Sequence, residues 1–220
     1  MSEWSTYTPA DFLMFSSRTY WRLVALYNEA VRPWQLLAIV AGGIVVGCLA
    51  RPTVHAHRIA MLLLAAAWAW VAWAYHLARY ADISTAGPYF AGAFALQALL
   101  LGGMGVRASN AQTRRLENRA GLAIAGLAVF AYPLLVLAGG RPWRQAELFG
   151  IAPDPTVIAT LGVLLAARIH WSAWLIPLAW CVVNAATLMA LRVGHAWVLP
   201  ACAVLAVAVG VGSRRAGGRH

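Results

Sequence analysis

Lysine is absent from this chain of 220 residues, and acidic residues are scarce. All 17 basic residues are arginines, and only seven residues are aspartate or glutamate. Charged residues make up 11% of the chain, whereas a soluble domain carries about 25%. The hydrophobic share of 62% and the mean hydropathy of +0.68 point the same way. The composition therefore excludes a water-soluble domain and predicts an all-α, multi-pass membrane protein.

Other absences exclude further classes. Without lysine there is no retinal Schiff base, so seven helices here would not indicate a rhodopsin. Three cysteines, Cys48, Cys181 and Cys202, lie in apolar runs without CxxC spacing and indicate neither disulfides nor a thiolate metal site. The Walker A, GxGxxG, HExxH and GxSxG patterns are missing, so no soluble-type catalytic residue is predicted. No nucleic-acid-binding motif occurs, so the positive charge is interpreted as a membrane-topology signal.

Seven apolar runs are long enough to cross about 30 Å of hydrocarbon. The predicted spans are 34–50, 58–78, 88–106, 120–138, 155–171, 173–191 and 196–212. Short loops join them, so we expect one transmembrane bundle over 34–212, preceded by an outer interfacial segment at 1–33 and followed by a basic cytoplasmic tail at 213–220. No cleavable signal peptide is expected. The Gly43-x-x-x-Gly47 spacing allows close helix packing and self-association, so a homo-oligomer or a membrane-protein partner stays open.

Arginine placement orients this bundle. Ten arginines fall in the first, third and fifth loops and the C-terminal tail, against seven on the other side. The side richer in arginine is cytoplasmic in most membrane proteins. We therefore expect a bacterial inner-membrane protein with a periplasmic N-terminus and a cytoplasmic C-terminus. The segment 155–171 is the weakest span, and a re-entrant half-helix is the alternative for it.

Two helix starts can be recognised. Asp154 followed by Pro155 is typical of an N-cap and a first helical position, and Thr8 with Pro9 repeats the pattern near the N-terminus. Over 18–31, apolar residues recur at helical spacing opposite a charged face, which predicts an amphipathic helix in the outer interface. The apolar residues on this face are Tyr20, Leu23, Val24, Tyr27 and Val31.

No ionisable residue is expected at mid-membrane, which disfavours a carrier with a buried carboxylate relay. Neutral polar residues do occur within the spans: Gln97, Tyr132, Thr160, Asn184 and Thr187. Such residues commonly form hydrogen bonds between helices. The alternative is a polar pathway lined by Gln97 and Asn184.

A candidate recognition or access surface lies on the outer side. Trp73, His76 and Tyr80 follow i, i+3, i+7 spacing and should share a helix face, as interfacial anchors or as part of a site. The other candidate residues are Tyr89, Trp143, Arg144, Glu147, Phe149 and Asp154. Because Trp143, Phe149 and Ile151 are apolar, we expect the loop that carries them to fold beneath the N-terminal helix. The start of the fifth span also offers free N–H groups to an anion.

Metal and cofactor chemistry has little support. His76 and His195 fall at a similar depth on different helices and are the weak candidates for haem or metal ligation, with no third ligand marked by spacing. His55 and His57 form a two-ligand fragment at best. No cofactor is predicted from these residues.

Three strings resemble an uncharacterised family of bacterial multi-pass inner-membrane proteins that is loosely labelled permease-like. They are YTPADFLMFSSRTYWRLVALYNEAV, AYHLARYADISTAGPYFAGAFALQALLLGG and GRPWRQAELFGIAPDPTVIATLGVLL, of which FGIAPDPT is the most specific. The resemblance extends from about Trp4 to about Ala206, and it implies no activity, substrate or site residue.

Three functions stay open from the sequence. The first is a small permease or channel for a neutral or anionic solute, entered from the outer face. The second is a non-catalytic subunit, assembly factor or sensor of a membrane complex. The third is a haem- or metal-bearing oxidoreductase component. The lipid bilayer is the one partner that all three require, and none involves nucleic acid.

Overall fold

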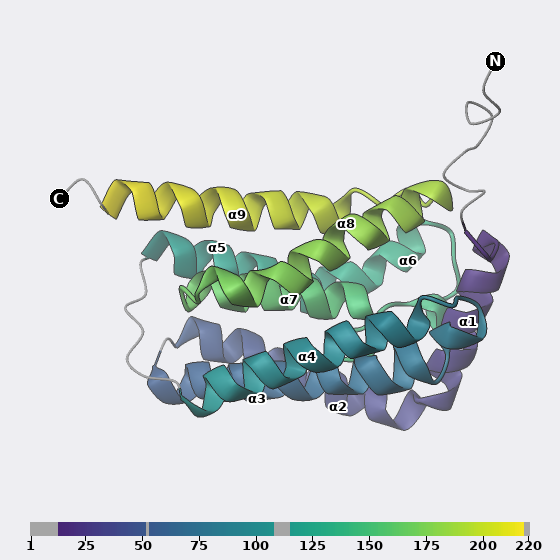
Figure 1. Ribbon diagram of the computed structural model, residues 1–220, viewed down its shortest axis with the longest axis horizontal. Coiled ribbons are helices and arrows are strands. Elements are labelled where there is room, and N and C mark those ends of the chain that lie inside the picture. The colour runs from purple at the N-terminus through teal and green to yellow at the C-terminus, as the bar shows by residue number, and fades with distance from the viewer. Residues whose placement is uncertain (1–12, 52, 108–114, 218–220) are drawn as a thin grey trace, which may run out of the picture.

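The computed structural model describes residues 13–51, 53–107 and 115–217, and this part of the chain is helical without β-strands (Figure 1). The elements follow as α1 (Ser17–Ala30), α2 (Arg32–Ala50), α3 (Val54–Trp70), the π-helix η3 (Val71–Leu77), η4 (Tyr80–Asp82), α4 (Gly87–Val106), α5 (Arg115–Gly126), the π-helix η5 (Leu127–Ala131), η6 (Tyr132–Leu134), α6 (Leu135–Ala138), η7 (Trp143–Gln145), α7 (Pro153–Ala166), η8 (Trp171–Trp174), α8 (Leu175–Ala190) and α9 (Val198–Gly217). Six of the seven predicted spans correspond to long helical segments, whereas the predicted span 155–171 corresponds to the shorter α7, which ends at Ala166. The expected helix at Thr8 lies outside the described residues.

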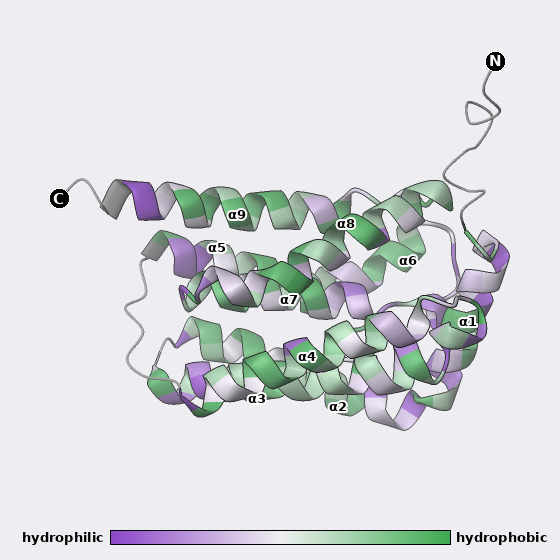
Figure 2. Ribbon diagram, in the orientation of Figure 1, coloured by the Kyte–Doolittle hydropathy of each residue, from purple (hydrophilic) through white to green (hydrophobic). Residues whose placement is uncertain are grey.

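Six helical segments of the described chain are long and apolar enough to cross a membrane: Arg32–Ala50, Val54–Asp82, Gly87–Val106, Leu116–Ala138, Trp171–Ala190 and Val198–Arg215. Their outer faces carry large apolar side chains, such as Leu36, Leu99 and Val204. Hydrophilic residues gather at the two ends of the bundle (Figure 2). Apolar outer faces at these lengths suit a lipid environment, so the protein is an all-α, multi-pass membrane bundle.

Helix α7 is the exception in length. Its 14 residues are all buried, and it lies in the middle of the bundle in contact with α3, α5, α8 and α9. At 1.5 Å per residue it extends about 21 Å, less than the hydrocarbon thickness of about 30 Å. It begins beside the loop under α1, the chain after it contacts α5 and α9, and it is not among the six segments long enough to cross a membrane.

Backbone contact between α5 and α7 explains why α7 can occupy the centre. A methyl group added to Gly162 would lie 2.6 Å from the carbonyl oxygen of Gly121, and one added to Gly121 would meet the backbone of Gly162. By contrast, Gly43 and Gly47 of α2 have no atom within 4 Å of such a position. The close glycine pair inside the described chain is thus on α5 and α7, and the GxxxG spacing of α2 faces outward.

The amphipathic helix α1 lies across one end of the bundle (Figure 1). Tyr20, Val24, Tyr27 and Val31 are buried as predicted, while Leu23 is half-buried. The side chain of Ser16 accepts a hydrogen bond from the backbone N–H of Thr19 and caps the helix start. Helix α1 is thus packed on protein over its apolar face and forms a cover for this end of the bundle.

The loop after α6 packs under α1. The Tyr27 hydroxyl donates to the carbonyl of Ile151 (3.1 Å), and the Asn28 amide donates to the carbonyls of Arg144 (2.9 Å) and Ala146 (2.8 Å). Phe149 and Ile151 are each 2% exposed, which confirms their predicted burial. Trp143 is 54% exposed, so the prediction was wrong for this residue. It lies in the short 3-10 turn η7 (Trp143–Gln145).

Candidate functional site

Asp154 lies at the centre of the candidate site. Helix α7 begins at Pro153 with Ala152 as the N-cap, so the prediction that Asp154 caps the helix and Pro155 starts it was wrong. Gly150, at a φ of +72°, turns the chain so that its N–H donates to the hydroxyl of Thr156 (2.8 Å). Asp154 consequently lies within the first helical turn, where its fully buried carboxylate faces the interior.

Side chains from two other elements bind the Asp154 carboxylate. The hydroxyl of Tyr132 in η6 donates to Oδ2 (2.9 Å), and the indole N–H of Trp180 in α8 donates to Oδ1 (3.0 Å). Asn184, one helical turn after Trp180, donates to both oxygens at 2.7 and 2.6 Å. Several donors and the positive end of the α7 dipole stabilise the ionised form of a buried carboxylate. Asp154 is therefore a buried carboxylate at a helix start, as its position in the sequence predicted, but it is enclosed by the bundle and does not face the outer surface.

Glu147 is the second buried carboxyl of this site. It comes from the loop before α7, is 5% exposed, and its Oε1 has no hydrogen-bond partner among the described residues. Burial, and then the charge of Asp154, raise the pKa of Glu147 to about 8, against the opposing effects of Arg141 and a hydrogen bond with Tyr20. At neutral pH the pair therefore holds one proton, carried by Glu147, and one negative charge on Asp154.

Arg141 connects these carboxyls to the protein surface. Its guanidinium lies over the Trp21 ring at 3.4 Å from the centroid, a cation–π contact with α1. Its Nη1 atom is buried without a hydrogen-bond partner among the described residues. The side chain also lines a cleft of about 430 Å³ between α1, α6 and the start of α9. Arg141 is thus the group through which a solute in the cleft would influence Glu147.

The cleft has a cationic and an apolar part. Arg141, Arg192 and His195 contribute polar atoms, and the apolar lining includes Leu135, Trp197 and Val198. Burial, and then the charge of Arg141, lower the pKa of His195 to about 4, so its ring is neutral at physiological pH. A second cleft of about 580 Å³ shares Arg141 and is lined by Arg18, Arg22 and Arg144 against one carboxylate, that of Glu29.

The candidate residues of the outer surface divide into two groups. His76, Tyr80, Glu147, Phe149 and Asp154 are buried, whereas Trp73, Tyr89, Trp143 and Arg144 are exposed. The expectation that Trp73 shares a face with His76 and Tyr80 was wrong because Val71–Leu77 forms a π-helix, which changes the angular spacing along the chain. The start of α7 is buried as well, so its N–H groups are not open to an anion from solvent.

The neutral polar residues within the spans have separate roles. Tyr132 and Asn184 bind Asp154, whereas Gln97 donates to the carbonyl of Ala173 (2.9 Å). The Thr160 hydroxyl accepts from the indole of Trp68 (2.8 Å), which joins α7 to α3. Thr187 is exposed and donates to Val183 within its own helix. No hydrogen bond of the described residues joins Gln97 to Asn184, so these contacts give no support to a polar pathway between them.

The two histidines proposed as weak metal ligands pack in different surroundings. The ring of His76 contacts Phe94 and Trp180, with centroids 4.5 and 5.0 Å apart. The ring of His195 contacts Tyr132 and Trp21, at 6.3 and 6.4 Å. In the described ranges no three His, Cys, Asp or Glu side chains come together as a metal site.

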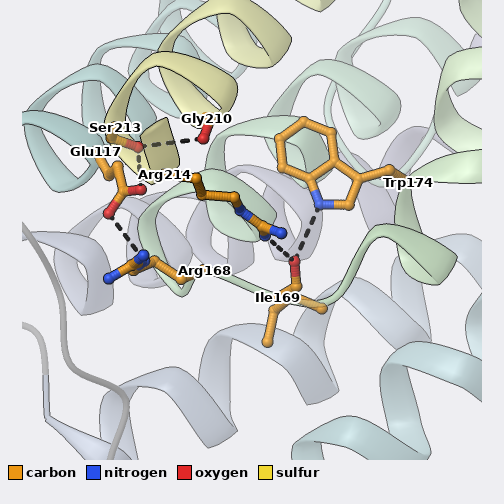
Figure 3. Close-up of polar contacts among 7 residues, drawn as sticks. All are labelled: Glu117, Arg168, Ile169, Trp174, Gly210, Ser213 and Arg214. Atoms are coloured by element: carbon orange, nitrogen blue, oxygen red, sulfur yellow. Dashed lines mark hydrogen bonds and ion pairs between the residues drawn. The ribbon is translucent and has the colours of Figure 1, made fainter. Parts of the chain in front are cut away.

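A separate polar cluster lies at the opposite end of the bundle (Figure 3). Arg168 pairs with the buried Glu117 at 3.2 Å, and the Ser213 hydroxyl donates to the same carboxylate. The Arg214 guanidinium donates to the carbonyl of Ile169 (3.2 Å). These contacts fasten the chain after α7 to α5 and α9, and we interpret them as structural.

Several site residues were missed from the sequence: Tyr20, Trp21, Tyr75, Arg141 and Trp180. Trp180 could have been found, because it precedes Asn184 by four residues and such pairs share a helix face. Arg141 was counted only as a topology signal. Its role depends on the loop folding inward under α1, which composition does not reveal.

Comparison with known proteins identifies a family. The model of a family of unknown function (DUF6064) matches residues 17–220. No curated protein and no solved structure matches the chain.

Proposed function

The chain belongs to this family of unknown function, and we propose that it is a membrane carrier that binds a small anionic solute at the end of the bundle covered by α1. The observation that carries the proposal is Arg141. Its guanidinium lines both clefts, is held by Trp21 and keeps one buried nitrogen without a protein acceptor among the described residues. An anion bound in either cleft would pair with the positive charge of this guanidinium.

Charge in the clefts favours an anion over a cation. The smaller cleft is lined by two arginines without a carboxylate, and the larger by four arginines with Glu29. A concave surface of one sign raises the local concentration of oppositely charged solutes. The apolar lining next to Arg141 adds a preference for an anion with an apolar body, for which benzenesulfonate is a suitable probe because it stays ionised.

We place the α1 end outside the cytoplasm. Ten arginines belong to the opposite loops and the C-terminal tail, and the arginine-rich side is usually cytoplasmic. Thr85 and Ser172 are exposed at the two ends, which makes Thr85→Cys and Ser172→Cys a matched pair in a background without the three native cysteines. An impermeant maleimide added to intact cells should label the first and spare the second. The reverse pattern would overturn the orientation.

Calorimetric titration of the purified protein with benzenesulfonate tests the anion site. Arg141→Gln should weaken binding at least about 10-fold, since a hydrogen bond to a charged group contributes about 1.5–3 kcal/mol. Arg107→Gln, which removes an exposed arginine at the other end, is the control and should leave binding unchanged. Equal binding by wild type and Arg141→Gln would contradict the proposal.

A further inference from the structure

Glu147 and Asp154, the two buried carboxyl groups of the site, have unequal surroundings. Asp154 receives hydrogen bonds from Tyr132, Trp180 and Asn184, whereas the buried Oε1 of Glu147 receives none from the described residues. Two neighbouring carboxyl groups in a buried site resist double ionisation, so the group that accepts fewer hydrogen bonds keeps a proton. Glu147 is that group.

We propose that Glu147 is a proton-binding site coupled to the anion site at Arg141, so that the protein takes up a proton together with the anion. The coupling rests on the proposed function, because it requires an anion to bind at Arg141. The proton binding itself rests only on the buried carboxyl pair.

The charged and titratable groups that act on Glu147 come from every element around it. Arg141 belongs to the same loop and Asp154 to α7. The phenols are Tyr20 on α1, Tyr75 on η3 and Tyr132 on η6. His195, before α9, lies next to Arg141 and Tyr132. Arg141 is the cation among these groups, and it stabilises the ionised form of Glu147.

The direction of the coupling follows from that cation. An anion on Arg141 neutralises its charge and removes the stabilisation of ionised Glu147, so at a pH near or above 8, where Glu147 is still partly ionised, Glu147 binds a proton from solvent. By linkage, protonated Glu147 also strengthens anion binding by the same factor. One anion and up to one proton bind together, and neither covalent bonds nor redox states change. Binding of a monovalent anion then adds little net charge to the site.

Proton uptake can be measured directly by calorimetry. Titrating the purified chain with benzenesulfonate in buffers of different ionisation enthalpy gives the number of protons bound per anion. At pH 8, close to the pKa to which burial raises Glu147, we expect uptake of up to half a proton per anion, because a group at its pKa is half protonated before the anion binds. Benzenesulfonate does not titrate in this range, so the protons bind to the protein.

Two variants test whether Glu147 is the group that takes up the proton. Glu147→Gln mimics the protonated carboxyl, so it should bind the anion with proton uptake reduced to zero. Asp82→Asn removes an exposed carboxylate that lines neither anion cleft and should keep the proton uptake of the wild type. Unchanged uptake in Glu147→Gln would overturn the assignment.

The two proposals can fail separately. Binding of benzenesulfonate by the wild type without any proton uptake would overturn the coupling and leave the anion site standing. If benzenesulfonate does not bind, the anion site is wrong, and infrared titration of the wild type decides the proton site. A protonated-carboxyl C=O band that is lost near pH 8 would support the site, and its absence would overturn it. If Glu147→Gln does not fold, the infrared titration of the wild type again decides whether Glu147 binds the proton.

Discussion

Asn184 donates hydrogen bonds from its amide nitrogen to both carboxylate oxygens of Asp154, at 2.7 and 2.6 Å. The contact joins the middle of α8 to the first turn of α7, 30 residues apart in sequence. Because α7 is short and wholly buried, this contact holds its polar end in the interior. The same contact keeps Asp154 ionised next to Glu147 and so connects fold stability with the proposed chemistry.

Loss of the Asn184 amide should destabilise the bundle. Asn184→Ala leaves part of the buried Asp154 charge without a donor, which costs about 1–3 kcal/mol or more of unfolding free energy. Thr187→Ala is the matched control on the same helix, because this exposed hydroxyl bonds only to Val183 within α8. Denaturant unfolding in detergent measures both variants. Equal stabilities would argue against a structural role of the Asn184–Asp154 contact.

The α5–α7 contact predicts a sharp difference between glycines. Gly162→Ala would place a methyl group 2.6 Å from the carbonyl oxygen of Gly121, so we expect a loss of about 1–3 kcal/mol in unfolding free energy, or failure to fold. Gly43→Ala has open space and should be neutral or slightly stabilising. Thermal unfolding compares the two variants. A tolerated Gly162→Ala would show that the two helices can separate without cost.

Asn28 should control how tightly α1 closes over the site. Asn28→Ala removes the two hydrogen bonds that the side-chain amide donates to the carbonyls of Arg144 and Ala146. The loop before α7 should therefore open more often. Hydrogen exchange of residues 146–152 should then accelerate roughly 10-fold, as expected for about 1.4 kcal/mol. Glu29→Ala, which removes a surface ion pair of 4.0 Å, should leave the exchange unchanged. Equal hydrogen exchange in Asn28→Ala and Glu29→Ala would contradict the role of Asn28 in holding the loop under α1.

The pH dependence of stability should report the protonation of Glu147. Its pKa in the folded state is raised from 4.5 to about 8, so the folded protein binds this proton more tightly than the unfolded chain. The proton on Glu147 therefore stabilises the folded protein fully below pH 4.5, and this stabilisation is lost as the pH rises to about 8. The pKa of His195 is lowered from 6.5 to about 4, so the folded protein binds this proton less tightly than the unfolded chain. This difference lowers the stability as the pH falls from 6.5 to about 4.

Comparison of wild type with Glu147→Gln isolates the glutamate. Above pH 6.5 the His195 contribution is constant, so the stability of the wild type should fall towards pH 8 relative to the variant. Denaturant unfolding across this range gives the difference. A constant difference between the two proteins would mean that Glu147 does not bind its proton more tightly in the folded state.

Hydropathy and spacing predicted the membrane bundle and the apolar face of α1 because both depend on residues close in sequence. The burial of Phe149 and Ile151 was also predictable, since apolar residues in a polar loop need cover. Glu147 and Asp154 were expected at the surface because loops and helix ends are usually solvated. The burial of Asp154 depends on donors from η6 and α8, and that of Glu147 on the loop folding under α1, which only the tertiary structure brings together. The π-helix η3 likewise displaced Trp73 from the face predicted by α-helical spacing.

Uptake of radiolabelled benzenesulfonate into proteoliposomes is the most direct test of anion transport coupled to Glu147. With the wild type, uptake should be faster when the outside is more acidic than the inside, and it should exceed that of protein-free liposomes. Arg141→Gln should abolish uptake, and Glu147→Gln should remove its dependence on the proton gradient. Wild-type uptake equal to that of protein-free liposomes, with or without the gradient, would contradict the account.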